Sequence, residues 1–345
     1  MRVAIALSGG VDSAASAIIL QDRGYDVFAV TMRNTDTPMR AAEKMAAALG
    51  IEHHVFDLRE AFKAAVIDPF LKAYLGGRTP NPCVLCNPTI KFGLLLERAL
   101  AFGAERFATG HYARVLRDDA GGRYLLARAD NRNKDQSYVL YRLKQEQLQL
   151  LIFPMGTIKT KEEAREIVRR RGIKVPAKES QEICFIPGGD YRSCIQGVAS
   201  EIKPGPVFDH YGNIVGKHRG LAYYTVGQRR GLGIALGFPA YVIKIDAVNN
   251  SLVVGPEEML YQSECLVGET NFISIASLNG ELPVDVKVRY TAPARPAVIT
   301  PAGEDKVRVK FLKPERAITP GQAAVFYDGD IVVGGGTILK MKNER

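Results

Sequence analysis

The chain has 345 residues, of which 46% are hydrophobic and 24% charged, with a formal net charge of +9 and a pI near 9.2. This length is too great for one ordinary core and indicates two or three domains, and no apolar run approaches the roughly 20 residues that span a membrane, which argues against a membrane protein. The positive charge favours a polyanionic partner, above all nucleic acid.

The first predicted element is a strand that begins at residue 2. Its apolar run is short, leads into Gly-Gly-Val-Asp-Ser and lacks a cleavage pattern, so we do not interpret it as a signal peptide. The chain has five cysteines. Without an export signal, this number is typical of a reducing compartment, so we expect a cytoplasmic protein whose thiols serve chemistry or metals.

The first half of the chain alternates strand-like and helix-like segments. Strands are predicted at 2–8, 26–34, 52–58 and 106–113, and helices at 13–24, 39–50, 60–77, 90–103 and 159–172. This alternation predicts an α/β domain with a parallel, doubly wound sheet over residues 1–198. We expect the sheet to bind a nucleotide.

The second half changes in texture. From about Glu201, short segments are punctuated by glycine and proline, which predicts a small mixed domain over residues 199–263. Alternating β-type runs then follow with turn residues between them. They predict a C-terminal antiparallel β-barrel over residues 264–345.

Residues 8–13, "SGGVDS", lie between the first strand and the first helix. A Gly-Gly turn exposes backbone N–H groups, and the helix N-terminus adds positive potential, so the loop suits phosphate oxygens. Asp12 suits Mg²⁺, and the glycine spacing of the two common nucleotide loops is absent. The alternative is a tight turn in which Ser13 caps the helix.

With that loop after a first parallel strand, the chain resembles the adenylating enzymes with a pyrophosphatase-type loop (PP-loop ATPases, with a HUP-like fold). Seven further motifs resemble the bacterial tRNA-specific 2-thiouridylases, and they run through nearly the whole chain. The resemblance implies an ATP-dependent enzyme that adenylates the C2 oxygen of the wobble uridine, in the tRNA anticodon, and replaces that oxygen with sulfur. The motifs are "NPCVLCN" (81–87), "ATGHYAR" (108–114), "NKDQSYVL" (133–140), "ESQEICFIP" (179–187), "KPGPV" (203–207), "TVGQRRGLGI" (225–234) and "VRYTAPARP" (288–296).

The resemblance implies two sets of binding residues. The residues implied for ATP and its Mg²⁺ are Ala6, Leu7, Ser8, Gly9, Gly10, Val11, Asp12, Ser13, Met32 and Gly110. The residues implied for tRNA are Asn81, Pro82, Cys83, Lys134, Asp135, Gln136, Arg289 and Tyr290. From the residues alone, 134–136 fit a solvated turn equally well, Tyr290 fits a core position, and His111 fits a satisfied polar residue at a strand end.

The stretch 78–93, "RTPNPCVLCNPTIKFG", carries two thiols three positions apart. Asn87 and Pro88 fit the cap and first position of a helix, which would place Cys86 before its positive end and favour a thiolate. The resemblance implies that Cys184 receives persulfide sulfur. It also implies that Cys86 then resolves the product by forming a disulfide.

Cys83 departs from the family pattern, because most members carry aspartate there. Cys83, Cys86 and Cys184 then suit a [4Fe-4S] cluster with one open iron that binds free sulfide, and we expect this site, with Asp12, to be catalytic. The alternatives are the persulfide route, with sulfur supplied by a relay protein, and a zinc site, for which a fourth ligand is missing. Cys194 and Cys265 are expected to be small buried residues.

Two other functions compete with tRNA thiolation. One is a different adenylating enzyme of the same superfamily, which the basic charge and the barrel disfavour. The other is a non-catalytic RNA-binding protein with a vestigial nucleotide fold, which the intact loop and the three thiols disfavour.

Overall fold

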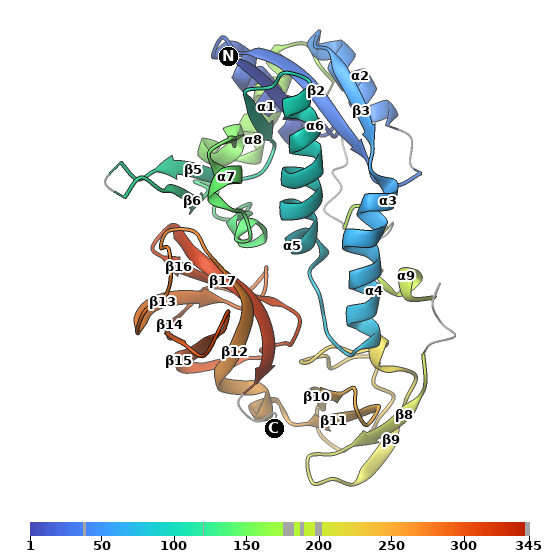
Figure 1. The fold of residues 1–345 in the computed structure, drawn as a ribbon. Helices are drawn as coiled ribbons and strands as arrows, with labels where there is room; N and C mark the ends of the chain where they lie inside the picture. Colours follow the sequence, from blue (N-terminus) through green and yellow to red (C-terminus); the bar gives the residue numbers. More distant parts are fainter. Residues whose placement is uncertain (37–38, 120, 175–182, 187–189, 197–201, 342–345) are drawn as a thin grey trace.

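The computed structural model describes residues 1–36, 39–119, 121–174, 183–186, 190–196 and 202–341. Three parts are visible in Figure 1: a sheet domain with its helices, a small strand domain coloured yellow to tan, and a barrel coloured orange to red. Long helices run down from the sheet toward the other two parts. The predicted order of domains is confirmed.

The N-terminal sheet is parallel and has the strand order β3-β2-β1-β4-β7. Its strands are β1 (Arg2–Ala6), β2 (Asp26–Arg33), β3 (His53–Asp57), β4 (Arg106–Thr109) and β7 (Leu151–Ile152). Chain order reverses between β1 and β4, so the crevice at the carboxyl ends of these strands is the expected place for a ligand.

Helices cover both faces of this sheet, as expected of a doubly wound domain. One face is packed by α1 (Val11–Asp22), α2 (Arg40–Leu49) and α8 (Lys161–Arg170), whose small and branched side chains share a core with β1. The other face is packed by two long helical runs. They are α3 (Arg59–Phe62) with η1 (Lys63–Ile67) and α4 (Asp68–Leu75), and α5 (Pro82–Cys86) with η2 (Asn87–Leu95) and α6 (Leu96–Ala101), where η1 and η2 are π-helical.

Between β4 and β7 the chain leaves the sheet. A hairpin of β5 (Ala113–Arg117) and β6 (Tyr124–Arg128) is followed by short helices, and further short helices occur later in the chain. The short helices are η3 (Ser137–Leu140), α7 (Gln145–Leu148), η4 (Pro154–Thr157), α9 (Arg192–Gln196), η7 (Leu221–Tyr223) and η8 (Glu257–Leu260).

The middle domain is a four-stranded sheet of order β10-β11-β8-β9 around a small apolar core. Its strands are β8 (Gly205–Phe208), β9 (Ile214–His218), β10 (Tyr241–Asp246) and β11 (Ser251–Gly255). Parallel and antiparallel pairs both occur, because β8 runs parallel to β11 and antiparallel to β9.

The C-terminal barrel closes because its first strand pairs with its last. Its strands are β12 (Tyr261–Phe272), β13 (Leu282–Lys287), β14 (Arg295–Pro301), β15 (Val307–Arg316), β16 (Ala323–Asp328) and β17 (Ile331–Met341). A Cβ on Gly335 would lie 2.8 Å from the Tyr141 ring. Glycine therefore lets the barrel wall approach the sheet domain closely.

The predicted domain boundaries stay predictions. The one between residues 263 and 264 falls inside β12, while the one between residues 198 and 199 lies outside the described residues, as do residues 179–182 and 187 of the "ESQEICFIP" motif. Within the described residues, no helix has both the length and the apolar character needed to cross a membrane.

Candidate active site

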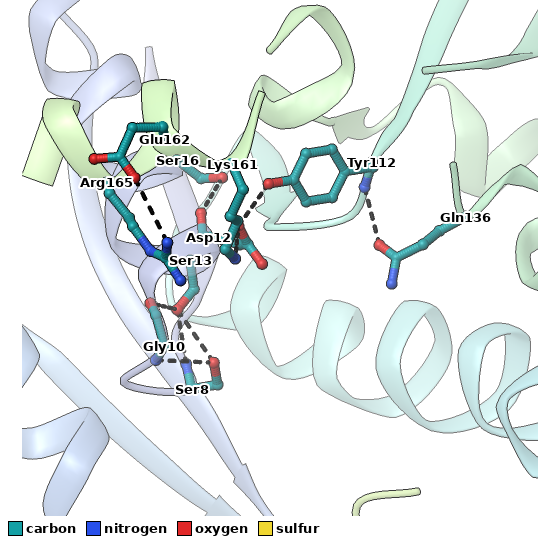
Figure 2. Close-up of polar contacts among 10 residues, drawn as sticks. All are labelled: Ser8, Gly10, Asp12, Ser13, Ser16, Tyr112, Gln136, Lys161, Glu162 and Arg165. Atoms are coloured by element: carbon teal, nitrogen blue, oxygen red, sulfur yellow. Dashed lines mark hydrogen bonds and ion pairs between the residues drawn. The ribbon is translucent and has the colours of Figure 1, made fainter. Parts of the chain in front are cut away.

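The loop between β1 and α1 is held in a fixed shape by its own serines (Figure 2). The Ser13 hydroxyl accepts from the Ser8 N–H at 3.3 Å and donates to the Gly10 carbonyl at 3.0 Å. Gly9 has φ +80°, and a Cβ there would lie 2.5 Å from the backbone of Ala41. The loop therefore requires glycine at position 9, and it presents the N-terminus of a 12-residue helix to the crevice.

Asp12 is the acidic residue of this loop, and two distant groups converge on it. The Tyr112 hydroxyl donates to its Oδ1 at 2.7 Å, and the Lys161 ammonium lies 2.6 Å from the same oxygen (Figure 2). Lys161 is the first residue of α8, with a side chain 17% exposed. We did not predict Lys161, because its only sequence signal is a lysine at the start of a charged helix.

The residues expected to bind ATP come together at the carboxyl edge of the sheet. Gly110 follows β4, and a Cβ there would lie 2.9 Å from the backbone of Asp12 and Ser13, so this segment packs directly on the loop. Met32 lies near the end of β2 and is half-buried. A helix N-terminus, two hydroxyls, an ammonium and a carboxylate form a set of groups that suits a nucleoside triphosphate and Mg²⁺.

The helix that carries Cys83 and Cys86 begins earlier than predicted. Its cap is Asn81, whose side-chain oxygen accepts from the Cys83 N–H at 3.1 Å, and Pro82 occupies the first position. Asn87 instead lies inside the helical run, where its amide donates to the buried Val139 carbonyl at 2.9 Å. The prediction that places Cys86 before the positive end is therefore wrong.

Burial is the main influence on the pKa of the Cys86 thiol. Cys86 is 7% exposed and packs in the core with Val84 and Ile90, and burial raises its pKa to about 12, against an opposing effect of Lys91. The expected thiolate is therefore not favoured in this state. The reason is desolvation, which outweighs the nearby positive charge.

Cys83 and Cys184 have exposed side chains, yet they share this environment. Desolvation by surrounding protein atoms raises the pKa of each, and Lys91 lowers it. The Asn34 amide lies 3.4 Å from the Cys184 sulfur and also lowers the pKa of that thiol. All three thiols interact electrostatically, so the fold brings together residues 98 positions apart.

The expected iron site is not formed by this arrangement. No group of three or more His, Cys, Asp or Glu side chains among the described residues is placed to hold a metal ion. The Cys86 thiol is buried in the core, whereas Cys83 and Cys184 are exposed. The described residues therefore show neither the expected three-thiolate cluster site nor a zinc site.

Lys91 and His111 form a polar pair between the thiols and the nucleotide loop. The Lys91 ammonium lies 3.4 Å from Nε2 of His111, whose Nδ1 lies 2.7 Å from the Thr109 hydroxyl. Desolvation and Lys91 both hold the pKa of His111 well below its usual range. His111 is thus a satisfied polar residue, as expected, and Lys91 is a site residue that the sequence reading missed.

The residues expected to meet tRNA lie on two surfaces. Asp135 is buried, and its carboxylate accepts from the Ala129 and Ser137 N–H groups, while Gln136 accepts from the Tyr112 N–H. Tyr290 is 39% exposed and donates to the Asp135 carbonyl at 3.3 Å. These hydrogen bonds of Asp135, Gln136 and Tyr290 hold the turn of residues 134–136 against the site.

Lys134 in the same turn is half-buried. Burial, Asp135 and Cys83 together raise the pKa of Tyr290, so the barrel lies near this thiol. Arg289 lies elsewhere, in a pocket lined with residues of the middle domain. The binding roles of these residues stay predictions.

Three domain families match successive parts of the chain. Residues 1–188 match the tRNA methyl transferase HUP domain, residues 195–256 the tRNA methyl transferase PRC-barrel domain, and residues 262–338 the aminomethyltransferase beta-barrel domain. These matches follow the three parts of the fold.

Curated relatives match over almost the full length. The tRNA-specific 2-thiouridylase MnmA of Desulforudis audaxviator is 49% identical over 337 residues, covering 97% of this chain and 98% of its own. MnmA 2 of Thermoanaerobacter sp. is 50% identical over 355 residues, covering 98% and 97%. The MnmA of Moorella thermoacetica is 47% identical over 351 residues, covering 97% and 98%.

Proposed function

The chain belongs to the tRNA-specific 2-thiouridylase family, and on that premise we propose that it adenylates the C2 oxygen of the wobble uridine of tRNA and replaces that oxygen with sulfur. The observation that carries the proposal is the convergence of Tyr112 and Lys161 on Asp12 in the glycine loop. The pair of Lys91 and His111 lies between this loop and the three thiols. A phosphate-binding loop and a sulfur site in one crevice suit an ATP-dependent thiolation.

In the first half-reaction ATP supplies the adenylyl group that turns the C2 oxygen into a leaving group. The loop holds the phosphates at the N-terminus of α1, and the Lys161 ammonium offsets their negative charge. Asp12 would supply a hard oxygen ligand for Mg²⁺, which would offset further negative charge of the phosphates. Tyr112 keeps Asp12 oriented through its hydrogen bond.

For the second half-reaction we propose the persulfide route. A sulfane-sulfur donor transfers one sulfur to Cys184, whose exposure lets the donor reach it. The terminal persulfide sulfur bonds to C2, and AMP leaves with the former C2 oxygen. Cys86 then bonds to the Cys184 sulfur, the old S–S bond breaks, and its electron pair stays on the transferred sulfur as C2 regains its double bond.

The products of this step balance. The proton lost by Cys86 returns to N3 of the base, the tRNA leaves as 2-thiouridine, and the protein keeps a Cys86–Cys184 disulfide. A dithiol reductant restores the two thiols for the next turnover. In this route Cys83 has no covalent role.

Incubation with ATP and tRNA tests the adenylation. We expect pyrophosphate release that requires tRNA, since the base is the acceptor of AMP. Release without RNA would assign the chain to another adenylating activity. Binding of tRNA without turnover would leave only an RNA-binding protein.

A matched pair of cysteine variants tests the sulfur step. Cys184→Ser should abolish thiouridine formation, measured by nucleoside mass spectrometry, while leaving pyrophosphate release. Cys194→Ser, at a half-buried cysteine outside the site, should retain both. The Cys83→Ala variant should keep its turnover in the absence of iron. If this variant is inactive and has also lost bound iron, the sulfur carrier is an iron-sulfur cluster and the persulfide route is wrong.

A further inference from the structure

Asn34 lies at the sulfur site, and neither of the two half-reactions described above uses it. It comes directly after β2, at the carboxyl edge of the sheet, and is half-buried. Its side-chain amide donates a hydrogen bond to the Cys184 sulfur at 3.4 Å. The two residues are 150 positions apart, so this contact is created by the fold and not by the local sequence.

Contacts on both sides fix the backbone that carries Asn34. Before it, the Arg33 carbonyl accepts from the Leu58 N–H at 3.0 Å. After it, the Asp36 carboxylate accepts from the Arg59 guanidinium at 2.5 Å. Leu58 and Arg59 lie where β3 leads into α3, so the segment after β2 is tied to the segment after β3. The amide of Asn34 therefore starts from a fixed place.

The backbone that carries Cys184 is anchored as well. The Ile186 N–H donates to the Ile183 carbonyl at 2.9 Å, which closes a turn around Cys184. Ile186 is 1% exposed, and the Phe185 ring packs edge-on against the Phe62 ring, with centroids 5.6 Å apart. The side chain of Cys184 is exposed between these anchored neighbours. The turn thus presents the sulfur to Asn34 and leaves it open to a donor.

The amide acts on this sulfur differently from the nearby cation. Burial raises the pKa of the Cys184 thiol, while Lys91 and then the Asn34 amide lower it, and Cys83 and Cys86 are electrostatically coupled to the same sulfur. An ammonium is a compact point charge, whereas an amide N–H favours a nearly linear hydrogen bond. The amide can therefore set the direction in which the sulfur points, which the charge of Lys91 alone does not.

We propose that Asn34 is a positioning residue of the sulfur step, which holds the Cys184 sulfur in one orientation while it accepts sulfur from the donor; the inference rests on the proposed function. In that step the Cys184 thiolate bonds to the outer sulfur of the donor persulfide. The S–S bond of the donor breaks, its electron pair leaves on the donor thiolate, and the outer sulfur keeps its proton. A hydrogen bond from the amide stabilises the attacking thiolate and keeps it aimed at the donor.

Three variants test this role. Asn34→Leu keeps the approximate shape of the side chain without an N–H donor, Asn34→Gln keeps the amide, and Asn279→Leu makes the same change at an exposed asparagine of the barrel. Inorganic polysulfide is the sulfur donor, and the rate of persulfide formation at Cys184 is measured by alkylation and peptide mass spectrometry. Pyrophosphate release with ATP and tRNA is measured in parallel.

Persulfide formation should slow roughly tenfold in Asn34→Leu, as expected for loss of one hydrogen bond to a charged group, while pyrophosphate release is unchanged. Asn34→Gln should recover most of the rate, and Asn279→Leu should follow wild type. This split between the two rates, together with the recovery by an amide, distinguishes positioning of the sulfur from general support of the fold.

The opposite results overturn the inference. If Asn34→Leu forms the persulfide as fast as wild type, or Asn34→Gln is as slow as Asn34→Leu, the amide does not position the sulfur, while pyrophosphate release by wild type still supports the proposed function. Equal losses of both rates in Asn34→Leu would show that Asn34 only supports the fold. Wild type that forms no persulfide at Cys184 overturns the persulfide route and this inference with it.

Discussion

The positive charge of Lys91 affects the pKa of the three thiols of the site and of His111. It lowers the pKa of Cys83, Cys86 and Cys184, although burial acts in the opposite direction and is the larger effect. On His111 both effects lower the pKa, so the imidazole stays neutral. Burial therefore favours neutral thiols and a neutral imidazole, while the positive charge of Lys91 works toward the thiolates.

Removal of this charge should change thiol reactivity with pH. In Lys91→Met the pKa of Cys184 should rise further, because the opposing cation is gone, so its alkylation by iodoacetamide should move to higher pH and be slower at pH 8. The rate is measured at Cys184 by peptide mass spectrometry across pH 7 to about 10, a range that brackets the usual thiol pKa.

Lys91→Arg is the control for this experiment, since it keeps the charge. Its alkylation profile should stay close to that of wild type. A Lys91→Met profile that coincides with wild type would show that Lys91 does not act on Cys184.

At the scale of the element, the helix of the two thiols shows where sequence reading succeeds and where it fails. Asn81-Pro82 and Asn87-Pro88 both fit a cap and a first helical position, so local signals cannot choose between them. Tertiary contacts determine which asparagine caps the helix, because the Asn87 amide donates to the buried Val139 carbonyl and leaves Asn81 as the cap. The run around Pro88 continues as a π-helix, in which the missing proline N–H is tolerated.

Two pairs of substitutions test this assignment through the free energy of unfolding. Asn81→Ala should cost about 1 kcal/mol by loss of the cap, and Asn81→Ser should restore most of it, because serine also caps. Asn87→Ala should cost more, about 1–3 kcal/mol, because it leaves a buried carbonyl unpaired. Asn87→Ser should not recover this loss, since its hydroxyl is too short to reach Val139.

Urea unfolding at equilibrium measures all four variants. Rescue by serine at position 87 but not at 81 would reverse the assignment of the cap.

At the scale of the whole molecule, the order of domains and the glycine loop are predictable because each depends on neighbouring residues. The periodicity of the first half and the alternation of the last third specify sheet and barrel. The ion pair of Asp12 with Lys161 joins residues 149 positions apart, so no spacing rule reveals it. The buried state of Cys86 depends likewise on packing with distant side chains.

The docking of the barrel on the sheet domain also depends on long-range contacts. The Asn271 amide at the end of β12 donates to the Tyr141 carbonyl at 2.7 Å and to the Leu143 carbonyl at 3.1 Å. The Tyr138 hydroxyl donates to the Ala323 carbonyl at 2.8 Å. Because Tyr290 of the barrel contacts Asp135 beside the thiol site, loosening the barrel should affect the site as well.

Asn271→Ala should therefore weaken the docking of the barrel. The change leaves two partly buried carbonyls without a donor, which costs about 1–3 kcal/mol in unfolding free energy. Asn279→Ala is the control, because that exposed side chain contacts only Ser277 nearby among the described residues, and its cost should stay within about 0.5 kcal/mol. Limited proteolysis should release a barrel fragment faster from Asn271→Ala than from wild type or the control. Equal release from all three proteins would show that Asn271 does not hold the barrel in place, and that the remaining contacts between the two domains suffice.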